Sequence, residues 1–100
     1  MSFFSTLFGA SVKYSRVEHP LTTEQVRHIM WSIHLPHINQ ENERAVSDAI
    51  LARRHGDGKI SLQQIYETLR QMETRRVITL PDRKSFMDAF KKHFAEHFRD

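Results

Sequence analysis

Three short segments of this 100-residue chain have the pattern of a helix capping box, and they constrain the fold more than any other feature. In a capping box, a Ser or Thr hydroxyl accepts a hydrogen bond from the backbone three residues later. The acidic or amide side chain at that later position then bonds back to the cap. The sequence therefore predicts helices that begin close to residues 22, 61 and 79. The cap pairs are Thr22–Gln25, Ser61–Gln64 and Thr79–Asp82.

Apolar spacing extends two helices in the first half of the chain. After Thr22, apolar residues recur at the period of a helix, and this helix should stop before Pro36, because a residue that precedes proline disfavours the α region. Asn39 is the predicted N-cap of a second helix that runs to about Arg54, where Gly56 follows. The inward residues are Val26, Ile29, Met30 and Ile33 in the first helix, and Val46, Ala49 and Ile50 in the second.

Two further helices are predicted in the second half. The stripe after Ser61 is the clearest in the chain, and a long helix from about Asp82 to Phe98 carries a row of Phe residues. The segment Arg76–Leu80 is short and β-branched, which favours an extended conformation. A short amphipathic helix is also expected in the first dozen residues. The apolar rows are Leu62, Ile65, Tyr66, Leu69 and Met72; Phe86, Phe90, Phe94 and Phe98; and Phe4, Leu7 and Phe8.

Length and composition indicate one helical domain. A chain of this length forms one core, and 39% hydrophobic residues with seven Phe are enough to fill it. We expect an all-α fold of four to five helices, with a helix-loop-helix pair in residues 1–74 and a basic connector plus final helix in residues 75–100. The absence of Cys excludes disulfides and a thiol nucleophile. No transmembrane segment is expected, and a cytoplasmic location is the default prediction; contact of the Phe3–Phe8 patch with a membrane stays open.

The segment "GDGKISLQQI" from Gly56 to Ile65 resembles the second half of an EF-hand calcium loop and the helix that leaves it. Asp57 falls at the fifth loop position, Gly58 at the sharp turn, Ile60 at the eighth position and Gln64 at the twelfth. A similar pattern occurs at residues 21–26, with an offset of 39 residues. The resemblance implies paired helix-loop-helix units with a minimal two-stranded contact where Leu21 and Ile60 approach each other. Tandem helical domains of the tellurite-resistance TerB type have similar helix starts. A resemblance to those domains would concern the pairing of helices and would imply no descent from a metal-binding loop.

The departures from the EF-hand pattern fall on the calcium ligands. Calcium binds six to eight oxygen atoms, and the loop supplies carboxylates at its first, third, fifth and twelfth positions. Here Arg53, His55 and Gln64 replace three of them, and only Asp57 remains. We therefore expect an EF-hand-like architecture that binds no calcium, with no cofactor.

The segment from residue 60 to 78 also resembles the recognition helix and wing entry of winged-helix regulators, such as the Fur and PadR families. This alternative would use Gln63 and Gln64 to contact bases, and Arg70, Arg75 and Arg76 to contact phosphates. Against it, the outward face of the helix is mostly neutral. In addition, the capped helix after Leu80 leaves no room for a hairpin wing.

Three features favour a surface that contacts a protein partner. Trp31 lies off the apolar face of its helix, where it is either a core residue on a second face or an exposed anchor. The Phe row of the last helix is long for a small domain, so part of it is a candidate homodimer seam or peptide groove. Arg83 and Lys84 extend the basic stretch that begins at Arg75 and Arg76. The predicted contact residues are Trp31, Arg75, Arg76, Arg83, Lys84, Phe90 and Phe94.

Catalytic and metal-binding patterns are weak. His93 and His97 have the i, i+4 spacing that can share a metal, but Phe94 stands where a metalloprotease motif has Glu, so a place beside the Phe row is favoured. No nucleophile elbow, P-loop or dinucleotide turn occurs. The sequence thus favours a non-enzymatic protein-interaction or regulatory module, either binding another protein or forming a homodimer. The alternative is a DNA-binding regulator.

Overall fold

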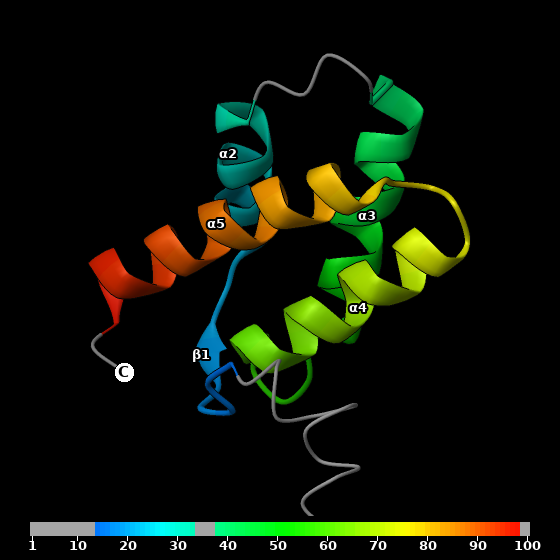
Figure 1. Cartoon of the computed structure of the whole chain (residues 1–100). Coiled ribbons are helices and arrows are strands. Elements are labelled where there is room, and N and C mark those ends of the chain that lie inside the picture. Colours follow the sequence, from blue (N-terminus) through cyan, green and yellow to red (C-terminus); the bar gives the residue numbers. More distant parts are fainter. Residues whose placement is uncertain (1–13, 34–37, 99–100) are drawn as a thin grey trace, which may run out of the picture.

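The computed structural model describes residues 14–33 and 38–98, which are mostly helical (Figure 1). Four helices and one small sheet occur in this part of the chain. The predicted helix around Phe4, Leu7 and Phe8 lies outside the described residues, as do residues 34–37. The elements are β1 (His19–Pro20), α2 (Thr23–Ser32), α3 (Gln40–Arg53), β2 (Lys59–Ile60), α4 (Leu62–Thr74) and α5 (Leu80–His97).

The caps place the helix starts where the sequence predicted them. All three capping boxes form, with both the hydroxyl bond and the return bond present, and the Asn39 side chain accepts from the backbone of Asn42. Helix α5 begins at Leu80, slightly before the expected start, because Thr79 is its N-cap and Pro81 fits the first turn. The expectation of an all-α fold with a minimal strand contact is confirmed.

The chain between α4 and α5 is not extended as expected. Arg75 and Arg76 form a turn, and residues 77 and 78 form a bend that leads to the Thr79 cap. The N–H of Val77 donates to the carbonyl of Met72, and the N–H of Arg76 donates to that of Glu73, so the end of α4 forms a Schellman motif. Satisfying the last carbonyls of the helix takes precedence over the β propensity of a short segment.

The two-stranded contact forms, with a register that differs from the expected one. His19 lies opposite Ile60 and Pro20 opposite Lys59 in an antiparallel pair, so Ile60 does not face Leu21. The N–H of Leu21 instead donates to the carbonyl of Gly58 at 3.0 Å. The contact joins the segment before α2 to the loop before α4 and thereby fixes the two helix starts relative to each other.

The four helices close into a ring around one core. Each helix packs against the next along the chain, and α5 returns to pack against α2 (Figure 1). Phe86, Phe90 and Phe94 of α5 lie at the centre. Leu21 and Ile60 are buried at the end where the two strands meet. The most deeply buried side chains are Leu21, Val26, Val46, Ile50, Ile60, Ile65, Leu69, Phe86, Phe90 and Phe94. Within the described part of the chain, none of the helices has the length and hydropathy that a membrane crossing requires.

Candidate binding pocket between α2 and α3

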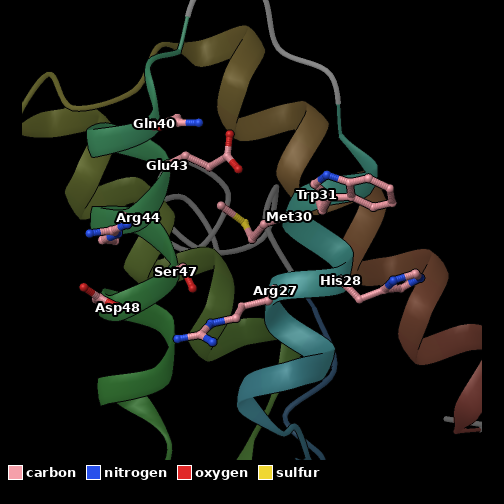
Figure 2. Close-up of a pocket in the computed structure, with 9 residues that line it drawn as sticks. All are labelled: Arg27, His28, Met30, Trp31, Gln40, Glu43, Arg44, Ser47 and Asp48. Carbon is pink, nitrogen blue, oxygen red and sulfur yellow. The ribbon is translucent and has the colours of Figure 1, made fainter.

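A pocket of about 830 Å³ lies between α2 and α3. Its size is within the range of small-ligand and peptide-anchor sites. Figure 2 shows Met30 and Ser47 between the two helices, with charged side chains around them and Trp31 at the edge of the pocket on α2. We call this surface the α2–α3 pocket. It is lined by Arg27, His28, Met30, Trp31, Gln40, Glu43, Arg44, Ser47 and Asp48.

Helix periodicity explains why polar residues gather on this surface. Helix α2 buries Val26, Ile29 and Met30, so the intervening residues turn outward. Helix α3 buries Val46 and Ile50 in the same way. Because each helix directs one face to the core, their neighbouring outward faces form the walls of the pocket.

Trp31 is the most exposed large apolar side chain in the described residues, with 76% of its surface accessible. The interpretation of Trp31 as a core residue on a second face is therefore wrong, and the alternative of an exposed position is confirmed. The reason is geometric, because Met30 completes the buried face of α2 and the next residue points away from it.

The pocket contains equal numbers of positive and negative side chains that have no charged partner within the described part of the domain. Arg27 and Arg44 supply two cations, and Glu43 and Asp48 supply two anions. Among the described residues, none of these four side chains forms an ion pair or a side-chain hydrogen bond within the domain. No sequence pattern singled out these four residues, although Arg44 and Asp48 stand one turn apart on the exposed side of α3.

Some of the basic residues on α4 and near the start of α5 form ion pairs within the domain, and others are exposed at its surface. Arg83 forms an ion pair with Glu73 and lies over the Tyr66 ring, 5.4 Å from its centroid. Arg70 pairs with the same carboxylate at 3.2 Å. The hydrogen bond from Arg83 and the two positive charges hold the pKa of Glu73 below its usual value, despite partial burial. Arg83 therefore ties α5 to α4, whereas the pair of Arg70 with Glu73 lies within α4.

Three other predicted basic contacts remain at the surface. Arg75, Arg76 and Lys84 are exposed, and no ion pair involves them among the described residues. Arg75 and Arg70 line a small surface depression of about 300 Å³. This region is separate from the α2–α3 pocket, so the structure does not bring the predicted basic contacts to Trp31.

Phe90 and Phe94, predicted as partner contacts, are core residues. Their exposed fractions are 0% and 2%, and Met87 beside them is also buried. Helices α2 and α4 cover this row from both sides. Neither Phe offers a side-chain surface to a partner in this structure.

Gln63 and Gln64, the predicted base-contacting residues, are engaged within the domain. Gln63 accepts a hydrogen bond from the N–H of Tyr14 at 3.2 Å and donates to Glu67. Gln64 completes the Ser61 capping box and donates to Glu18 at 3.3 Å. The start of α4 is thus occupied by the segment that precedes α2.

Two of the four positions that the EF-hand resemblance assigns to calcium ligands, His55 and Gln64, contact each other. His55 contacts Glu18 and lies 3.3 Å from the amide nitrogen of Gln64. Arg53 instead reaches Glu67 at 2.9 Å. Asp57 is exposed at the tip, where Gly56 and Gly58 have positive φ angles of 61° and 81°.

His93 and His97 stack on each other beside α2, with ring centroids 4.1 Å apart. With His28 they line a pocket of about 410 Å³. The Nε2 atom of His93 is buried without a hydrogen-bond partner, and burial, followed by the nearby His97, lowers the pKa of His93 below its ordinary value. Among the described residues, no group of three or more His, Asp or Glu side chains is arranged to hold a metal ion.

No family model matches this chain, and neither a curated protein nor a solved structure shows significant similarity to it. The choice among the surfaces described above therefore depends on their geometry and chemistry. The α2–α3 pocket combines a concave shape, an exposed Trp and unpaired charges of both signs, and it is the strongest candidate site.

Proposed function

We propose that this protein is a non-enzymatic interaction module that binds a protein partner at the α2–α3 pocket. The observation that carries the proposal is Trp31, whose side chain is 76% exposed beside a concave surface. Trp is the residue most enriched among the side chains that dominate binding energy at protein interfaces. The helix-loop-helix architecture serves as the scaffold that holds α2 and α3 at a fixed spacing, without bound calcium.

The free energy from burying Trp31 supports this choice. An aromatic side chain buries about 150–250 Å² in an interface, and each Å² of apolar surface contributes about 25 cal/mol. The indole alone would thus contribute several kcal/mol, of the order that a single interface anchor supplies. The unpaired charges around it add specificity, because a partner must match both signs.

The DNA-binding alternative has less support. Arg75, Arg76 and Lys84 are exposed and fit phosphate contacts. However, Gln63 and Gln64 are held by bonds within the domain, and Arg83 is paired with Glu73. A salt-dependent complex with duplex DNA that disappears when Arg75 and Arg76 are changed to Ala would favour this alternative over a protein partner.

Site-directed photo-crosslinking tests the proposed function. A benzoylphenylalanine residue replaces Gln40, which is exposed at the edge of the α2–α3 pocket, and the full chain is irradiated in the cells that produce it. We expect discrete protein adducts, which the additional change Trp31→Ala removes. The control places the same crosslinker at Gln71, an exposed position on α4.

The crosslinking result separates a binding pocket from an inert surface. Adducts that form from Gln40, depend on Trp31 and are absent from Gln71 support the proposal. Equal labelling from both positions, or no discrete adduct from Gln40, would exclude the α2–α3 pocket as a protein-binding site.

A further inference from the structure

The charges of the α2–α3 pocket are arranged so that the pocket complements itself. Arg44 and Asp48 stand one helical turn apart on the exposed face of α3. Arg27 on α2 and Glu43 on α3 supply the second cation and the second anion (Figure 2). A uniformly acidic or basic partner would leave two of the four charges facing charges of the same sign. A partner with the same balanced set would leave none.

We infer that the occupant of the α2–α3 pocket is a second copy of this chain, bound face to face about a two-fold axis. The inference rests on the proposed function, because it names the partner of the same surface. In a two-fold interface the same patch is used twice, so each contact between two positions occurs in both directions. A surface with two cations, two anions and one exposed Trp meets that requirement.

The spacing of Arg44 and Asp48 selects one register for the inferred contact. When two copies of α3 pack antiparallel about an axis level with Val46, Arg44 of one copy lies opposite Asp48 of the other. The reciprocal pair forms at the same time. By the same symmetry, a contact between Arg27 of one copy and Glu43 of the other would occur twice.

A charge-swap experiment tests this register. Sedimentation velocity of the purified full chain, over a concentration series that ends in the millimolar range, should show a species of twice the 11.9 kDa chain mass. Arg44→Asp alone and Asp48→Arg alone should each weaken self-association by about tenfold or more, because each creates two like-charge contacts per dimer. An equimolar mixture of the two variants should restore the dimer, because every pair again joins opposite charges.

Matched variants locate the interface. Trp31→Ala should weaken self-association, whereas Lys84→Glu, a charge reversal at an exposed residue outside the pocket, should leave it unchanged. Circular dichroism of each variant confirms that a loss of association is not a loss of folding. Self-association that responds to Lys84→Glu and not to the pocket variants would overturn the inference.

The failure of this inference differs from the failure of the proposed function. A chain that stays monomeric at millimolar concentration overturns the homodimer. If Gln40 still gives Trp31-dependent adducts with another protein, the interaction module stands with a different partner. If the chain is monomeric and Gln40 gives no adduct, both proposals fail.

Discussion

Arg76 has a positive φ of 62°, the only such value at a non-glycine residue in the described part of the chain. It occupies the position after the helix cap in the Schellman motif that ends α4, where glycine is strongly preferred. An L side chain in the left-handed region costs about 1–2 kcal/mol, partly offset by the smaller backbone entropy that a non-glycine residue loses on folding. We therefore expect Arg76→Gly to raise the free energy of unfolding by about 0.5–1 kcal/mol, measured by urea denaturation.

Arg75 provides the matched control for that substitution. Its φ is −82°, which any residue adopts, so Arg75→Gly should lower the free energy of unfolding by about 0.5–1 kcal/mol. The same Arg→Gly change at two adjacent exposed positions should thus affect the free energy of unfolding in opposite directions. Destabilisation by both would show that the Arg76 side chain makes a contact that compensates for its backbone conformation.

His93 makes the stability of the domain depend on pH. Burial and then the nearby His97 lower its pKa below 6.5; Glu96 opposes this shift, and His28 adds to it. The folded state therefore binds the His93 proton less tightly than the unfolded state does, and stability falls as the pH drops below about 6.5. Urea denaturation between about pH 7.5 and 5.5 should show this decrease in the free energy of unfolding. The change His93→Leu should make the free energy of unfolding depend less steeply on pH. An unchanged slope in the variant would assign the pH dependence to other groups.

At the scale of elements, the loop before α4 is held together, and joined to the segment before α2, by bonds of its own residues. Its tip is closed by two backbone bonds between His55 and Lys59, of 3.0 and 2.9 Å. Gln64, His55 and Glu18 then connect the loop to the segment before α2. These contacts add to the pairing of β1 with β2, which joins the same two segments.

We expect calcium at about 1 mM, the range of weak extracellular sites, to leave the amide resonances of Asp57 and Gly58 unchanged in a titration followed by NMR. The reason is that one carboxylate cannot replace the hydration shell of the ion. The exposed Asp88 on α5 serves as the control for nonspecific effects of charge. A saturable shift at Asp57 and Gly58 in the micromolar range, absent at Asp88, would contradict this prediction.

Local sequence signals predicted the elements well because capping is a short-range interaction. The N-caps Thr22, Asn39, Ser61 and Thr79 each bond to a backbone group three residues away, so the pattern and the geometry coincide. The strand register was not predictable in this way. It depends on the bond between Leu21 and Gly58, which lie far apart in the sequence.

At the scale of the whole molecule, the candidate site was predicted only in part. Trp31 stood out because it breaks the apolar period of its helix, but the charges around it come from a second helix whose position the sequence does not reveal. Conversely, Phe90 and Phe94 looked like a candidate surface because one helix presents a long apolar row. The ring of helices buries that row, since α5 packs against both α2 and α4.

A comparison of two aromatic residues tests this division between core and surface. Phe90 is fully buried, so Phe90→Ala removes a central side chain and should lower the free energy of unfolding by about 3–5 kcal/mol. Trp31→Ala removes an exposed side chain and should change the free energy of unfolding by less than about 0.5 kcal/mol. Both values come from urea denaturation of the purified chain.

The protein concentration decides what the Trp31 measurement means. Association that involves only the folded state raises apparent stability as concentration rises. At low concentration, where the chain is monomeric, Trp31→Ala and the unmodified chain should unfold alike; at high concentration only the unmodified chain should gain stability. A loss of several kcal/mol at low concentration would show that Trp31 stabilises the fold itself, and its exposure would then no longer support a binding role.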